Sequence, residues 1–148
     1  MAVRAGGDAP GSRRTRPPDP ALALLEAEIA ELETLPRFDR DGAAVRADRA
    51  VAAARAAGWT ELELRAQLVQ AEVRQRRGEL ADAGRLAQQV LKWATENGSR
   101  HLLARGHYVL QAVFLDLGDL SLALEHSVRA AELLPDAASE TLLSLIHI

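Results

Sequence analysis

Apolar residues recur along most of the chain at helical spacing, in blocks that end at Gly or Pro. The first block places apolar residues three or four positions apart, at Leu22, Leu25, Ile29 and Leu32. This spacing predicts an amphipathic helix that Asp19 caps and Pro36 ends. The later blocks predict five more helices, over residues 41–57, 60–77, 80–97, 102–117 and 120–134.

Local signals mark where these helices begin and end. Gly58 and Gly118 can take the left-handed conformation that often ends a helix. Thr60 stands three residues before Glu63, which is the spacing of an N-terminal capping box, and Ser99 is expected to cap a later helix. The pattern therefore predicts helices joined by very short turns.

The chain contains an internal repeat, because residues 58–97 align with residues 98–137 without a gap. Identical residues stand at several aligned positions, namely Gly58/Gly98, Leu62/Leu102, Arg65/Arg105, Val69/Val109, Val73/Val113, Gly78/Gly118, Leu80/Leu120 and Ala83/Ala123. A fixed period of this length is typical of stacked helix pairs that share one core. We therefore predict an all-α solenoid of antiparallel helix pairs, with about three 40-residue repeats. Ala83 and Ala123 are expected where the two helices of a pair approach most closely.

Composition narrows the class of protein. The chain is 48% hydrophobic but only 3% aromatic, so the core must consist of Leu, Val and Ala, which suits closely packed helices. A formal net charge of −3 gives no sign of a nucleic-acid partner. The absence of cysteine excludes disulfides and thiolate metal sites and favours a cytoplasmic location. No apolar run reaches the roughly 18 residues of a membrane span, so no membrane partner is expected.

The residues around Gly118 resemble a tetratricopeptide repeat. That family has a glycine and an acidic residue in the turn, small residues early in the second helix and seven positions later, and a closing proline, which here are Gly118, Asp119, Ala123, Ala130 and Pro135. The preceding unit keeps Gly78, Glu79 and Ala83, but it has Val90 for the later small residue and Ala94-Thr95 where the proline should be. The period is also longer than the family's usual length of about 34 residues. The resemblance covers about residues 19–138 and implies a right-handed solenoid.

Longer repeats of this Ala- and Leu-rich kind resemble the N-terminal halves of bacterial signalling proteins. Residues 118–126 and 129–134 are most similar to the repeats that precede the GGDEF catalytic domain in actinobacterial diguanylate cyclases. Helical-repeat transcription regulators are the next most similar group. Neither catalytic nor DNA-binding signatures occur in this chain, so the resemblance concerns a longer parent protein.

The two ends differ from the repeats. Residues 1–18 are rich in Gly, Pro and Arg and are predicted to be a disordered tail, and residues 19–142 are predicted to form the repeat domain. Residues 143–148 resemble the translated end of a sequencing adapter, and we interpret them as an artefact. Leu142 lies one repeat period after Leu102, as expected for the start of a fourth unit in a truncated chain. The alternative is a genuine short C-terminal helix.

No catalytic constellation is found in the sequence. It contains no nucleotide-binding glycine loop, nucleophile elbow or His-Glu-x-x-His motif, and no cofactor or metal is expected. The four histidines, His101, His107, His126 and His147, are too widely spaced to share a metal on one helical face. The pairs Glu31/Glu33 and Glu61/Glu63 are interpreted as solvated charge, and Trp59 and Trp93 as packing anchors.

A helical-repeat array offers a concave surface lined by the first helix of each pair. Carried over from the tetratricopeptide family, the groove positions are Arg65, Leu68, Glu72, Gln75, Arg76, Arg105, Tyr108, Ala112 and Asp116. Arginine and tyrosine at such positions suit a peptide carboxylate or an acidic helix. Equally, Arg65 and Arg105 could pair with acids of adjacent helices.

The sequence thus favours a non-enzymatic protein-interaction region or regulatory scaffold from a longer bacterial signalling protein. Its partner would be a protein or peptide, and exposed repeat ends would favour self-association. Two alternatives remain open. The first is the regulatory region of a diguanylate cyclase, truncated before its GGDEF domain, and the second is the N-terminal part of a helical-repeat transcription regulator.

Overall fold

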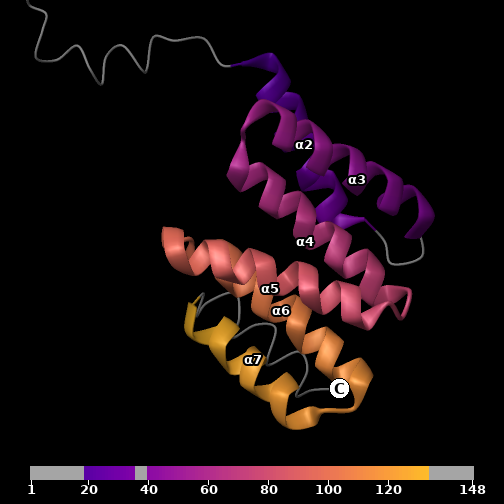
Figure 1. Cartoon of the computed structure of the whole chain (residues 1–148), viewed down its shortest axis with the longest axis vertical. Coiled ribbons are helices and arrows are strands. Elements are labelled where there is room, and N and C mark those ends of the chain that lie inside the picture. The colour runs from indigo at the N-terminus through magenta and orange to yellow at the C-terminus, as the bar shows by residue number, and fades with distance from the viewer. Residues whose placement is uncertain (1–18, 36–39, 134–148) are drawn as a thin grey trace, which may run out of the picture.

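The described part of the chain is entirely helical. The computed structural model describes residues 19–35 and 40–133, and within these ranges it contains helices and no strand (Figure 1). The helices are α2 (Pro20–Thr34), α3 (Arg40–Ala57), α4 (Thr60–Arg76), α5 (Leu80–Asn97), α6 (Arg100–Leu117) and α7 (Leu120–Leu133). The predicted all-α class is confirmed. None of these helices is long and apolar enough to cross a membrane.

The helices begin at an even interval along the chain, because the same turn is used four times. Gly58, Gly78, Gly98 and Gly118 all have φ between 69° and 83°. At each turn the N–H of the next residue donates to a carbonyl five residues back, as Trp59 does to Ala54 (2.9 Å) and Asp119 to Phe114 (2.9 Å). This is the Schellman arrangement, in which a left-handed residue satisfies the free carbonyls of a helix end.

Two of the three N-terminal helix caps predicted from the sequence are present in the structure. The Asp19 side chain accepts from the N–H of Ala21 (2.9 Å), and the Ser99 hydroxyl accepts from the N–H of Leu102 (3.4 Å). The predicted capping box at Thr60 is wrong, because Trp59 occupies the N-cap position of α4 and makes no side-chain cap bond. The Schellman turn at Gly58 needs the backbone of Trp59, so α4 begins at Thr60.

Several predictions from the sequence lie outside the described residues. They are the disordered tail over residues 1–18, the helix ends at Pro36 and Pro135, the fourth unit at Leu142 and the artefact over residues 143–148. The second helix begins at Arg40, one residue earlier than predicted.

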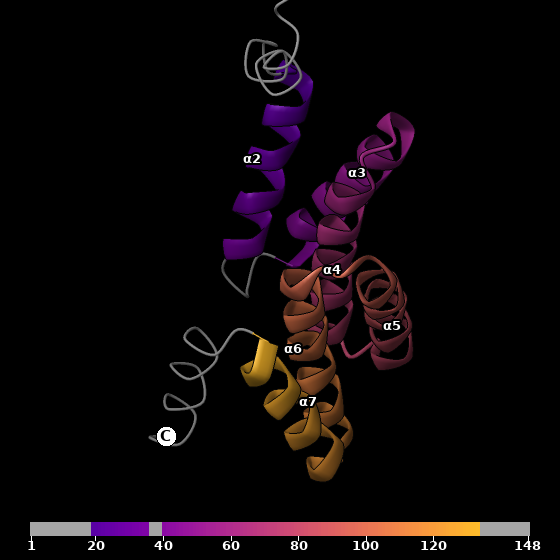
Figure 2. The ribbon, with the colours of Figure 1, turned by 90° about the vertical axis from the view of Figure 1, so that its left-hand side faces the viewer.

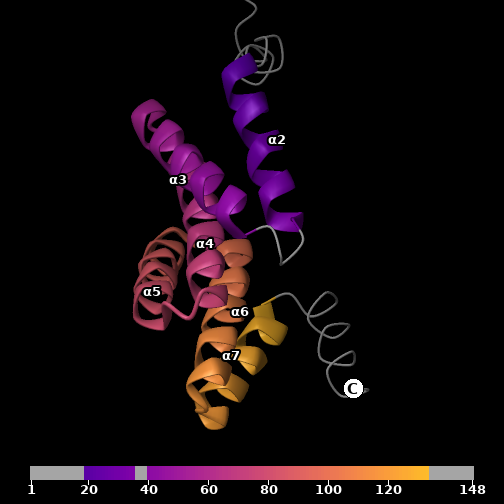
Figure 3. The same cartoon turned by 90° about the vertical axis from the view of Figure 1, so that its right-hand side faces the viewer.

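Helix α4 lies at the centre of the fold and is buried on two sides (Figures 2 and 3). Leu62, Ala66, Val69 and Val73 pack with residues of α2 and α3. Leu64, Leu68 and Ala71 pack with residues of α5 and α6. The buried Gln67 side chain donates to the Leu86 carbonyl (3.1 Å) and to Oε1 of Gln89 (2.8 Å), which ties α4 to α5.

The helices lie in two rows. Helices α2, α4 and α6 form one row, in which α4 contacts both α2 and α6. Helices α3, α5 and α7 contact the helices next to them in sequence, and within the described residues they do not contact one another. Figures 2 and 3 show the C-terminal end of α2 beside the first turns of α6, so residues far apart in sequence meet there.

Small residues set the spacing between helices. Ala83 and Ala123 are 0% and 2% exposed, as expected for close helix contacts just after a turn. The sequence analysis did not single out Gly106, where a Cβ atom would lie 2.7 Å from Cδ2 and 3.0 Å from Cγ of Leu91. Helix α6 therefore packs against Leu91 of α5 through a residue without a side chain.

Gly84 and Gly106, which both lie inside helices, allow a matched stability test. Gly84→Ala should stabilise the protein by about 0.5–1 kcal/mol, because no atom lies within 4 Å of its Cβ position and alanine favours helix. Gly106→Ala should instead destabilise it, because displacing Leu91 costs about 1–3 kcal/mol. Urea unfolding measures both. Equal stabilisation by the two changes would show that α5 and α6 are not in close contact.

Candidate functional site on α2, α4 and α6

The predicted groove residues lie on α4 and α6, the two neighbouring helices of one row. Arg65, Glu72, Gln75, Arg76, Arg105, Tyr108 and Ala112 are half-buried, and Asp116 is exposed. Leu68 is 0% exposed and belongs to the core between α4, α5 and α6. It is therefore unavailable to a ligand, and its assignment to the groove is corrected.

The charged members of this set form a network centred on Glu33 of α2. The Nη2 and Nε atoms of Arg65 lie 2.9 and 3.3 Å from the Glu33 carboxylate. Arg105 also donates to Glu33, and its Nη2 atom lies 3.0 Å from Oε1 of Glu72. The hydrogen bonds that Arg65 donates to the Glu33 carboxylate raise the pKa of Arg65 above its ordinary value. Pairing of both arginines with acids of adjacent helices is thus confirmed.

Other predicted residues extend the network along the two helices. Nε2 of Gln75 donates to Oδ2 of Asp116 (2.7 Å), which joins α4 to α6 at their C-terminal ends. Nη2 of Arg76 lies 3.7 Å from Oε2 of Glu72 within α4. The structure therefore brings six of the nine predicted residues together on one face, which we call the α4–α6 face.

Glu33 is the residue that the sequence analysis missed. It was interpreted as solvated charge, yet its side chain is only 18% exposed and bridges two arginines. The one available signal was a break in the repeat, since the equivalent positions one and two periods later carry the buried Val73 and Val113. An acid at a core register indicates that α2 packs differently from α4 and α6.

This pairing alters what the arginines can recognise. Glu33 and Glu72 already occupy the positions that a ligand carboxylate would take beside Arg65 and Arg105. An incoming acid would have to displace a half-buried carboxylate, and this would leave that carboxylate without its partners. Recognition of an acidic peptide at these two residues therefore stays a prediction without structural support.

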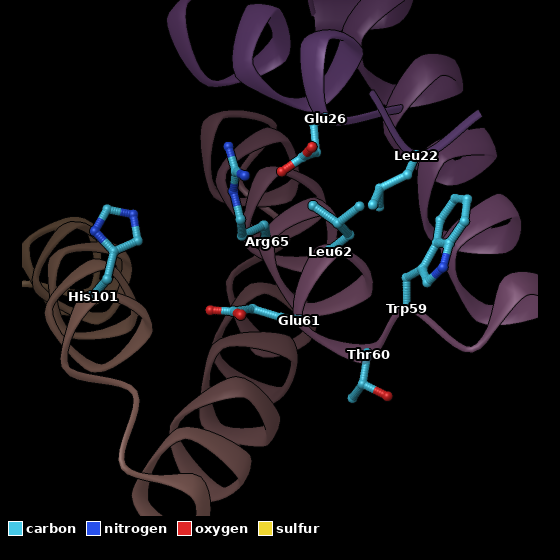
Figure 4. A pocket seen from close by; sticks show the side chains of 8 residues that line it. All are labelled: Leu22, Glu26, Trp59, Thr60, Glu61, Leu62, Arg65 and His101. Atoms are coloured by element: carbon cyan, nitrogen blue, oxygen red, sulfur yellow. The ribbon is translucent and has the colours of Figure 1, made fainter. Parts of the chain in front are cut away.

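An open cavity of about 690 Å³ lies beside the α4–α6 face, where α2 meets the first turns of α4 and α6 (Figure 4). Its lining residues are Leu22, Glu26, Trp59, Thr60, Glu61, Leu62, Arg65 and His101. Trp59 packs against the core of α2, α3 and α4, as predicted, and also lines the cavity. The volume is within the range of small-ligand and side-chain pockets.

The cavity has an apolar and a charged end. In Figure 4, Leu22 and Leu62 point toward one another beside the ring of Trp59. On the other side of Leu62 lie Glu26, Arg65 and Glu61, and Glu61 points toward His101 on α6. Such a site suits a ligand with an apolar body and a polar head.

A second cluster lies between α6 and α7. The Nδ1 atoms of His107 and His126 are 2.9 Å apart, and Phe114 stacks on His126. The sequence analysis compared histidines along single helices and did not expect this pair. Burial, His126 and Arg129 lower the pKa of His107 to about 4, and burial also lowers that of His126. Within the described residues, no group of three or more possible metal ligands is found, so this pair is interpreted as packing.

Removing the centre of the network should destabilise the protein. Glu33→Gln leaves the half-buried Arg65 without an ion-pair partner and Arg105 with Glu72 alone, which should lower the free energy of unfolding by about 1–3 kcal/mol. Glu31→Gln is the control, because Glu31 lies on the same helix and its ion pair with Arg46 is exposed. Urea unfolding at moderate salt compares the two, and equal losses would contradict the role given to Glu33.

The histidine pair should make stability depend on pH. The pKa of His107 is about 4 in the folded state and near 6.5 in the unfolded state, so the unfolded state binds the proton first. The stability is therefore complete only well above the unfolded pKa, at about pH 8, and it is lower by about 2 kcal/mol at pH 5. Urea midpoints at these two pH values, for the native chain and His107→Phe, measure this. A pH dependence that persists in the variant would assign it to other groups.

Comparisons with models of protein families, with curated proteins and with solved structures found no match to this chain. The resemblances to tetratricopeptide repeats and to GGDEF proteins therefore stay predictions from the residues around Gly118.

Proposed function

We propose that this chain is a non-enzymatic protein-interaction region, built as a tetratricopeptide-like solenoid of helix pairs. The two rows of helices support this proposal, because a row of first helices is the surface on which such arrays bind their partners. The proposal includes a cytoplasmic location and a longer bacterial signalling parent. A diguanylate cyclase parent and a transcription-regulator parent rest on the resemblance alone, and the domain encoded downstream would distinguish them.

One observation carries the proposal: an open cavity adjoins a face of half-buried polar side chains that come from neighbouring helices. The charges of that face are largely compensated within it, as Glu33, Arg65, Arg105 and Glu72 show. A network held in this way presents fixed donors and acceptors, which reduces the entropic cost of binding. This combination fits recognition of a polypeptide segment.

Helix α7 supports the further prediction of self-association. Leu120, Leu124 and Val128 lie four residues apart on one side of this helix and are 68%, 63% and 46% exposed. An exposed apolar row of this kind is typical of a surface that packs on another helix. Residues 134–148, which follow it, lie outside the described part of the chain.

Peptide display tests the proposed function. A library of random peptides is selected on the full chain, and enriched peptides are then measured against Ala112→Arg. This change places a large cation one helical turn before Asp116, on the same side of α6. Ala81→Arg, at an exposed position of α5, is the matched control. We expect enriched peptides whose affinity falls roughly tenfold or more with Ala112→Arg only. No enrichment, or equal losses with both variants, would contradict the proposal.

A further inference from the structure

The charges that line the cavity are not balanced. Its one arginine, Arg65, is held by both oxygens of Glu33, which lies outside the lining. Glu26 and Glu61 are exposed and make no hydrogen bond or ion pair within the described residues. Each adds only a weaker electrostatic attraction to Arg65. The cavity therefore presents two carboxylates that lack a cation of their own.

The two carboxylates stand beside an apolar wall. Figure 4 shows Glu26 on α2 and Glu61 on α4 on either side of Arg65, with Leu62 between these charges and Trp59. Leu62 lines the cavity and is only 7% exposed, so the core holds its side chain in place. Leu22 and Trp59 are half-buried and add apolar surface to the lining. A ligand with a flexible apolar stem and a cationic end matches both halves.

We propose that this cavity binds a lysine or arginine side chain from a basic segment of the partner protein. The inference rests on the proposed function and specifies the charge of the partner. Glu26 and Glu61 attract the cationic end, and Leu62 packs against its methylene groups. The neighbouring apolar side chain of the segment contacts Leu22 and Trp59.

The same geometry argues against an acidic ligand here. A carboxylate entering the cavity would approach Glu26 and Glu61, and the arginine that could attract it is already bound to Glu33. The two arginines that suggested an acidic partner in the sequence thus pair with glutamates of this chain. The charged side chains of the cavity that make no ion pair are negatively charged. The volume of about 690 Å³ leaves room for a second side chain of the segment beside the cationic one.

Three synthetic peptides test the inference on the full chain. The first alternates arginine with leucine, the second replaces arginine by its neutral isostere citrulline, and the third replaces arginine by glutamate. Fluorescence anisotropy of labelled peptides gives the affinities. We expect the arginine peptide to bind, the citrulline peptide to bind roughly tenfold more weakly, and the glutamate peptide not to bind.

Charge variants assign the binding to this cavity. Glu26→Gln combined with Glu61→Gln should weaken the arginine peptide roughly fivefold to tenfold and leave the melting temperature unchanged, since both side chains are exposed. Glu125→Gln combined with Glu132→Gln removes two exposed charges from α7 and is the matched control. In a Trp93→Phe background, binding should also change the fluorescence of Trp59, which lines the cavity.

The outcomes separate this inference from the proposed function. Equal weakening by the two double variants would overturn it, because the attraction would then come from overall charge. Tight binding of the citrulline or glutamate peptide would overturn it as well. If display enriches acidic or neutral peptides that depend on Ala112, the proposed function stands and this inference fails. If display enriches no peptide, the proposed function is contradicted, and the inference that rests on it is contradicted as well.

Discussion

The fold depends on the burial of α4 on two opposite sides. One side, with Leu62, Val69 and Val73, closes the core of α2 and α3, and the other, with Leu64 and Leu68, closes the core of α5 and α6. A helix of this kind has no fully solvated face, so the polar residues along its buried and half-buried sides are stabilised by partners at the edges of the two cores. Gln67, Arg65 and Glu72 bond to neighbouring helices in this way.

The irregular packing of α2 creates the candidate site. Glu33 stands where later repeats have valine, and its carboxylate draws the end of α2 toward Arg65 on α4 and Arg105 on α6. The earlier part of α2 then borders an open cavity, lined by its own Leu22 and Glu26. The same glutamate compensates the arginines of the face, so that acidic groups dominate the charge left in the cavity.

Much of the fold could be predicted from the sequence, because the helix ends are set by local chemistry. Gly58 and Gly118 each end a helix as predicted, since the left-handed turn needs no side chain from elsewhere. The predicted cap at Thr60 was wrong for a related reason. The backbone N–H of Trp59 takes part in the preceding turn, and Trp59 occupies the N-cap position of α4. Of the candidate site, the sequence indicated Arg65 and Arg105 but not the carboxylate that binds both.

The helices and their even spacing can be read from the order of residues, because helix periodicity and helix ends depend on near neighbours in the chain. The pairing of charged side chains, in contrast, follows from how the helices pack in three dimensions. Glu33 and Arg105 are 72 residues apart, and His107 and His126 belong to different helices. Such contacts depend on the angle at which helices cross, which arises from the packing of whole cores and from no single segment.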